Sequence, residues 1–317
     1  MPLHLIHGPP NSGRARLVRE RLEAALDRDP ILVVPTLDDV HAFERELCAA
    51  GAVLGATTTT FGGLFRLVAS ASDAPAPLEL TPAQRRRAVA VAVNERHGRL
   101  GPLRRSAARA GFALALSRLI EELQAGGLRP ADVEAAAGTL ESSAYLTDVA
   151  ALFAGYEAVR ERAGLADAHS VAGRAIALLR ESPAAWRRPV FLYGLDDLTG
   201  NQFELLAALV ARGEVTFALP YEEENAAIAA RTAPLLERLR GLGVASETRT
   251  DPQPAHTDDP LLFHLERSFG RAGAERRAPR GGLTLLRSAG ERGEAEAIGA
   301  AVARLHAEGA EPGEIAI

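Results

Sequence analysis

The sequence contains no lysine, so all 36 of its basic residues are arginines. Together with the abundant alanine and glycine, this absence is typical of a GC-rich genome, and it offers a neutral reason for an arginine wherever lysine is usual. Cysteine is nearly absent as well. Cys48 is the only one, which excludes a disulfide framework, and we expect it to be a small buried residue of an amphipathic helix.

Long hydrophobic runs are also missing, since no apolar stretch approaches the roughly 20 residues that cross a bilayer. The N-terminus lacks a basic segment followed by a long apolar stretch, so no secretory signal is predicted and a cytoplasmic location is expected. The 317 residues, 47% hydrophobic and 24% charged, are typical of a globular protein with two or three structural units.

Acidic residues are scarce in one segment. The net charge of −5 argues against DNA binding by the whole surface, but the segment from Arg85 to Arg109 holds eight arginines and one acid, Glu95. These arginines could grip phosphates without reading sequence, or they could form an ordinary solvated helix face. The two interpretations have equal weight, and Arg85, Arg86 and Arg87 are the candidate DNA-binding residues of this segment.

Strand and helix patterns alternate in two segments of the sequence, before Thr81 and again between Leu179 and residue 247. Short apolar runs at 3–7 and 31–35 and a threonine run at 57–60 predict strands, each followed by a helical pattern, and strands return at 189–195 and 214–220. This order predicts an α/β fold with a parallel sheet, right-handed crossovers and helices on both faces. From Thr81 to Leu179 only helical patterns occur, which predicts an all-helical insertion.

The expected domains follow from these patterns. A final strand, helix and strand at 283–317 would begin a second α/β unit, so the chain is expected to be the N-terminal part of something longer. The domains are the first part of an α/β domain at 1–78, the helical insertion at 79–180, the second part of the α/β domain at 181–247, a linker at 248–282 and the second unit at 283–317.

The stretch GPPNSGRA, residues 8–15, resembles a phosphate-binding loop, GxxxxGK[ST], between a strand and a helix. Arg14 stands in place of the lysine, and Ala15 in place of the hydroxyl that holds Mg²⁺. Both changes argue against hydrolysis and weaken the case for ATP and Mg²⁺ as cofactors. The candidate residues of this degenerate nucleotide site are Gly8, Asn11, Ser12, Gly13, Arg14 and Ala15.

Hydrolysing loop proteins also need an acidic pair at the end of a neighbouring strand. If Gln202 is aligned with the glutamine that follows this pair in helicases, Tyr193 and Gly194 occupy its two positions. Asp196 and Asp197 come a few positions late, and we expect them to cap the helix that starts near Asn201. His4 and His7 have no acidic or cysteine partner at ligand spacing, so neither a metal site nor a set of catalytic residues is predicted.

The motifs taken together resemble the N-terminal half of AddB, a subunit of a bacterial ATP-dependent helicase-nuclease related to superfamily 1 helicases. The agreement in order and spacing covers nearly the whole chain. It involves GPPNSGRA, ILVVPTLDDVHAF, TTTTFGGLFRLV, LTPAQRRRAV, LIEELQAGGLRPADV, LFAGYEAVRERAGLADAHS, FLYGLDDLTGNQFELLAAL and LTLLRSAGERGEAEAIGAAVARL.

The resemblance implies a RecA-like domain with a helical insertion, the start of a second RecA-like domain, and a role in double-strand break repair. It also implies DNA and an AddA-like helicase-nuclease subunit as partners. Thr60 and Phe61 match the place where related helicases contact single-stranded DNA, although such a phenylalanine often belongs to the core. The expected function is a helicase-like scaffold without ATPase activity. The alternatives are a functioning ATPase with a variant loop and a pure protein interaction module.

Overall fold

The computed structural model describes residues 3–50, 54–72, 75, 78–139, 143–182, 186–251, 259–278 and 283–317. The chain divides into two compact units, Met1–Gln253 and Pro254–Ile317, which we describe separately.

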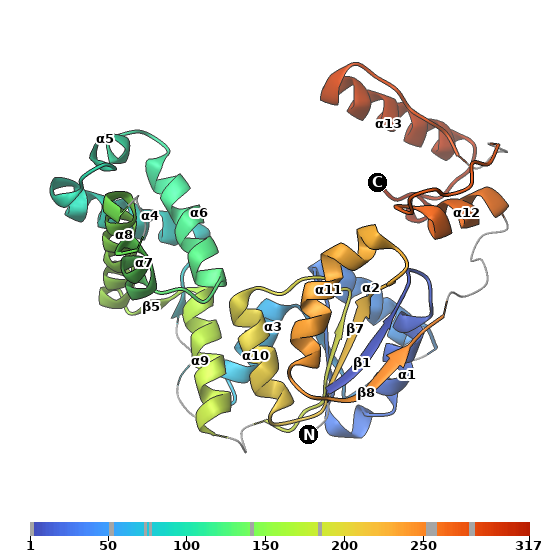
Figure 1. Cartoon of the computed structure of the whole chain (residues 1–317), viewed down its shortest axis with the longest axis horizontal. Helices are drawn as coiled ribbons and strands as arrows, with labels where there is room; N and C mark the ends of the chain where they lie inside the picture. The colour runs from blue at the N-terminus through green and yellow to red at the C-terminus, as the bar shows by residue number, and fades with distance from the viewer. Residues whose placement is uncertain are drawn as a thin grey trace. The chain divides into compact units, whose positions relative to one another are not determined.

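The first unit contains a six-stranded sheet in which every pair of neighbouring strands is parallel. The spatial order is β3-β2-β6-β7-β1-β8 (Figure 1). The strands are β1 (Leu3–Gly8), β2 (Ile31–Val33), β3 (Thr57–Thr59), β6 (Val190–Tyr193), β7 (Val215–Pro220) and β8 (Val244–Arg249). This arrangement confirms the predicted α/β class, while its RecA-like identity stays a prediction.

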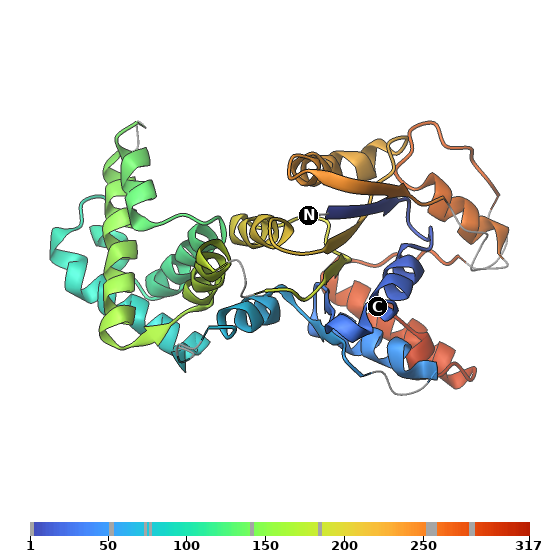
Figure 2. The same ribbon diagram turned by 90° about the horizontal axis from the view of Figure 1, so that it is seen from below.

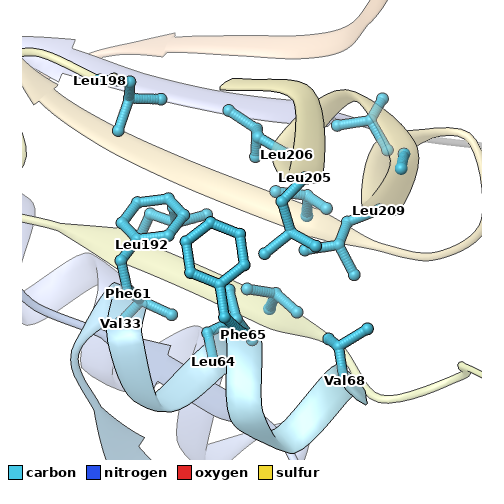
Figure 3. Packing of buried hydrophobic residues seen from close by; sticks show 14 of the residues in the cluster. Val33, Phe61, Leu64, Phe65, Val68, Leu192, Leu198, Leu205, Leu206 and Leu209 are labelled. Atoms are coloured by element: carbon cyan, nitrogen blue, oxygen red, sulfur yellow. The ribbon is translucent and has the colours of Figure 1, made fainter. Parts of the chain in front are cut away.

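Helices cover both faces of the sheet because successive strand residues point to opposite sides. In β1, Leu3 and Leu5 join the core on one face and Ile6 joins the core on the other. The first face is covered by α3 (Phe61–Ala69), α9 (Ala168–Glu181), α10 (Gly200–Val210) and α11 (Ala226–Arg240). The second face is covered by α1 (Arg14–Glu23) and α2 (Leu37–Leu47). Figure 3 shows side chains of α3 and α10 meeting over the sheet.

A helical subunit with its own core follows α3, as Figures 1 and 2 show. It consists of α4 (Pro82–Arg96), α5 (Arg104–Ala107), α6 (Phe112–Ala125), α7 (Pro130–Ala137) and α8 (Ser143–Arg162). Short strands β4 (Leu78–Glu79) and β5 (Leu165–Ala166) pair where the chain enters and leaves it. The insertion was predicted to extend to residue 180, but α9 packs in the core of the sheet and not in this subunit.

The structure contradicts several predictions for the C-terminal third of the chain. The linker was expected from residue 248, whereas β8 continues to Arg249 beside β1. The strands expected at the start and end of 283–317 are wrong, since the described residues 259–278 and 283–317 contain α12 (Pro260–Ser268), α13 (Gly290–Ala307) and no strand. A strand needs a neighbour for its backbone groups, and these residues supply none. Residues 252–258 and 279–282 of the expected linker lie outside the described residues.

Cys48 is exposed, so the expectation that it is buried is wrong. The helix α2 ends at Leu47, which is buried, and Cys48 begins the following 3₁₀ turn where the chain leaves the apolar surface. As for the membrane, no helix within the described ranges is both long and apolar enough to span one.

A buried polar network joins the helical subunit to the sheet. Asp167, at the start of α9, accepts hydrogen bonds from the Tyr156 hydroxyl at 2.8 Å and from the Gln124 amide at 3.1 Å, and its Oδ2 lies 3.3 Å from both Arg85 Nη1 and Arg160 Nη1. Burial by itself raises the pKa of Asp167, but the hydrogen bonds from Ser170 and the charge of Arg160 outweigh it and hold that pKa well below its usual range. The carboxylate therefore stays charged at the joint.

We expect Asp167→Asn to lower the free energy of unfolding by about 3 kcal/mol, because Arg85, with a side chain only 12% exposed, loses its counter-charge and Arg160 keeps only the exposed Glu161. Urea unfolding at neutral pH measures this loss. Asp132→Asn, at the exposed start of α7, is the matched control and is expected to cost less than about 1 kcal/mol. Equal losses for the two variants would contradict this role of Asp167.

Candidate functional site

The carboxyl ends of all six strands lie at one edge of the sheet, as expected of parallel strands. The strands β1 and β7 are neighbours there, yet the helix after β1 covers one face and the helix after β7 covers the other. In parallel α/β folds, ligands commonly bind at the point of such a divergence. The predicted phosphate loop, between Gly8 and Arg14, follows β1 directly at this point.

The loop has the backbone shape that its sequence predicts. Asn11 and Gly13 have positive φ values of 53° and 78°, and α1 begins at Arg14 directly after the second glycine. Gly13 occupies the N-cap position without a side-chain cap, so the first turn of the helix opens toward the loop. The half-motif therefore has the turn and helix start that a phosphate loop uses.

Arg14 turns its charge inward to the protein backbone. Its Nη1 donates to the carbonyl oxygen of Gly8 at 2.5 Å and to that of Leu219 at 2.9 Å, and thereby joins the ends of β1 and β7. Burial lowers the pKa of Arg14, with Tyr193 acting in the opposite direction, and the guanidinium stays charged at neutral pH. The Nη1 group is therefore directed at backbone carbonyls, while the guanidinium has three further N–H donors on Nε and Nη2.

The segment after β8 covers the other side of the loop. The Thr250 hydroxyl lies 2.6 Å from the Ser12 hydroxyl, and the Thr250 amide donates to the His7 carbonyl at 2.7 Å. A methyl group on Gly8 would come within 2.2 Å of Thr250 Oγ1, so glycine is required there by this contact rather than by a positive φ. Thr250 was missed from the sequence because it lay in the expected linker.

The positions aligned with the acidic pair carry no acid and form a packed strand end. Tyr193 packs edge-on against Phe43 with ring centroids 5.3 Å apart. Gly194 has a φ of 77°, and Pro35 lies close to where its side chain would be. Tyr193 lies near Arg14 and Gly194 has no side chain, so neither position supplies a carboxylate to order a metal-bound water.

The role expected for Asp196 and Asp197 is wrong, because neither caps α10. The N-cap is Thr199, whose hydroxyl accepts from the Gln202 amide, while the Gln202 side chain accepts from the Thr199 amide at 2.9 Å. Asp196 instead pairs with Arg231 at 2.7 Å. Gln202 thus completes a capping box, a role that the T-x-x-Q spacing could have revealed.

The two histidines near the loop have polar partners. His7 lies 2.8 Å from Glu247 of β8, and His4 lies 2.6 Å from the Ser246 hydroxyl. Within the described ranges, no three histidine, cysteine or acidic residues gather as a metal site would require.

The candidate DNA-binding residues divide into buried and exposed ones. Thr60 caps α3, and Phe61 is only 5% exposed in the core beside Phe65 (Figure 3). Phe61 also lines one side of a cavity of about 260 Å³. Arg85 is held in the Asp167 network and lies over the Tyr156 ring. Arg86 and Arg87 are exposed, so of these five only the last two present a free charged surface.

Comparisons with known proteins add no relative: no family model matches this sequence, and no curated protein matches it. The site has therefore to be interpreted from its own residues. Those residues do not fit ATP with Mg²⁺, since Arg14 is bound to two carbonyls, Ala15 has no hydroxyl and Tyr193 and Gly194 replace the acids.

We expect the protein to become less stable as the pH falls through 6.5. Burial lowers the pKa of His7 and of His169 below their ordinary value of 6.5, so the unfolded chain binds protons more readily than the folded one. Urea unfolding at about pH 7.5 and about pH 5.5 measures the difference.

His7→Gln is expected to reduce this pH dependence because one of the two histidines is removed. Replacing the exposed His41 by glutamine gives the matched control. A free energy of unfolding that stays constant or rises between the two pH values would contradict the burial argument.

Proposed function

We propose that this protein is a helicase-like scaffold that guides DNA and binds a catalytic partner but does not hydrolyse nucleotide. The observation that carries the proposal is the position of the Arg14 guanidinium, which bonds the carbonyls of Gly8 and Leu219. The loop keeps the positive φ values and the helix start expected of a phosphate site, and its cation links the ends of β1 and β7.

Two further features support the absence of hydrolysis. The Ser12 hydroxyl bonds Thr250, and Ala15 has none, so no free hydroxyl of the motif is available for Mg²⁺. Tyr193 and Gly194 supply no carboxylate for a metal or a water. The resemblance to AddB supports the rest of the proposal, namely a RecA-like fold, an AddA-like partner subunit and a role at DNA ends.

The purified protein is expected to show no ATP turnover and no ATP binding in the presence of Mg²⁺. Calorimetry with ATP and a phosphate-release assay measure the two. The variant Arg14→Lys with Ala15→Thr is expected to stay inactive, because the acidic pair is missing as well.

Arg14→Ala separates the alternative of a working variant loop from our proposal. If the wild type hydrolyses ATP and Arg14→Ala abolishes this activity, the protein is an ATPase and the proposal is wrong. If the wild type shows no turnover, Arg14→Ala has a structural effect only. The loss of the two hydrogen bonds between β1 and β7 is then expected to lower the free energy of unfolding in urea by about 2 kcal/mol.

For DNA, the exposed pair Arg86 and Arg87 is expected to contact phosphates. Arg86→Ala with Arg87→Ala should weaken binding of a DNA strand of about 20 nucleotides and reduce the slope of log K against log salt by about 1.4. Fluorescence anisotropy at several salt concentrations gives both values.

The matched control is Arg16→Ala with Arg19→Ala, which removes the same charge from α1. Arg85 is left intact, because its loss would disturb the joint with Asp167. Binding that both double variants weaken equally, or that neither changes, would contradict a contact at Arg86 and Arg87.

A further inference from the structure

The exposed arginines of the helical subunit extend well beyond Arg86 and Arg87. Six exposed arginines follow one another along α4, the turn after it, and α5 with its C-terminal turn, and we call them the arginine track. Among the described residues, none of the six lies within ion-pair distance of a carboxylate. They are Arg86, Arg87, Arg99, Arg104, Arg105 and Arg109.

The track has two charged ends and a neutral middle. On α4, Arg86 and Arg87 at the first turns are followed at helical spacing by Ala90 and Asn94, and then by Gly98 in the next turn. The one acid of the segment, Glu95, is paired with Arg162 of α8 at 2.7 Å. The one acid that α4 carries between the two ends is therefore paired.

The two ends are separated by the rest of α4 and the turn after it. From Arg87 to the end of α4 at Arg96, nine residues extend about 14 Å at 1.5 Å per residue. At the near end, Arg85 is anchored in the Asp167 network, next to the exposed pair. At the far end, α5 lies at the tip of the helical subunit away from the sheet (Figure 1).

The far end is anchored by a buried carboxylate. Asp148 of α8, only 6% exposed, accepts from the Gly101 amide at 3.0 Å and from the Leu103 amide at 2.9 Å. Leu100 beside this turn is buried in the helical core. The backbone that carries the distal arginines is thus held against α8, and both ends of the track belong to one folded body.

A ligand that complements the positive charge of the arginine track has to be a polyanion. The residue types of α4 and α5 favour duplex over single-stranded DNA. Proteins that bind single strands without sequence preference combine positive charge with aromatic side chains on which bases stack. The sequences of α4 and α5, PAQRRRAVAVAVNER and RRSA, contain no aromatic residue. A duplex carries a phosphate charge about every 1.7 Å along a straight axis, so its evenly spaced phosphates can meet both ends of the track.

We propose that the arginine track binds the backbone of duplex DNA without reading its sequence. This inference rests on the proposed function, because it assumes that the scaffold guides DNA, and it names the form of DNA and the surface. Arg86 and Arg87 then form the proximal contact, and Arg104, Arg105 and their neighbours form the distal one.

The test compares the full chain with two double variants on a hairpin duplex of about 12 base pairs and on a single strand of equal length, by anisotropy over a salt series. The proximal variant is Arg86→Ala with Arg87→Ala, and the distal variant is Arg104→Ala with Arg105→Ala. Each is expected to weaken duplex binding and to reduce its salt slope by about 2, since two phosphate contacts are lost.

Two control variants show whether a loss of binding comes from the charge of the track or from a general change in charge or folding. Arg104→Lys with Arg105→Lys should retain most duplex binding, because lysine also neutralises phosphates, and Arg16→Ala with Arg19→Ala should leave it unchanged. Circular dichroism verifies that each variant is folded.

The remaining outcomes separate this inference from the proposed function. If single-stranded DNA binds through Arg86 and Arg87 while the distal variant has no effect on either DNA, the duplex track is wrong and DNA guidance stands. If the distal variant binds duplex as the wild type does, the track is also wrong. If the wild type binds neither DNA, both proposals are wrong.

Discussion

The hydrogen bonds from Arg14 to the carbonyls of Gly8 and Leu219 determine what the edge of the sheet can do. A partly buried charged group has either to face an anionic ligand or to find acceptors within the protein. Arg14 finds acceptors at the ends of two neighbouring strands. The same contacts link β1 to β7, so the guanidinium acts as a structural brace at the place where a nucleotide-binding protein would keep a free cation.

The surroundings of the loop agree with this role. Thr250 packs so closely on Gly8 that only glycine fits, and its hydroxyl engages Ser12. Glu247 of β8 is paired with His7, which directly precedes Gly8 in β1. The start of the loop is therefore held by β8 and its continuation, and a phosphate there would have to displace several satisfied contacts at once.

Neighbouring arginines of one short run serve opposite purposes in the helical subunit. Successive residues of a helix are about 100° apart, so Arg85 turns inward to Asp167 and Tyr156 while Arg86 and Arg87 face outward. The inward residue fixes the joint with the sheet, and the outward ones begin the arginine track. A rigid joint and a charged outer surface together suit a scaffold that holds DNA in a fixed direction, as we propose.

The sequence by itself determined the elements with strong local signals. The buried strands at 31–33 and 190–193 were predicted from short apolar runs, and the positions of the loop and the missing acids followed from motif spacing. The edge strand β8 was missed because its exposed and half-buried residues alternate and lack an apolar run. The strand expected at 283 failed for the converse reason, since apolar residues without a neighbouring strand form no sheet.

Only the tertiary structure decided where the charged side chains of these elements go. The sequence identified Arg14 as a substitution, but its two acceptors come from residues 6 and 205 positions away. Likewise, Arg85 could not be told from Arg86 until Asp167, 82 positions along the chain, was placed beside it. Local patterns report backbone periodicity, whereas the direction of a guanidinium depends on acceptors that folding brings from distant parts of the chain.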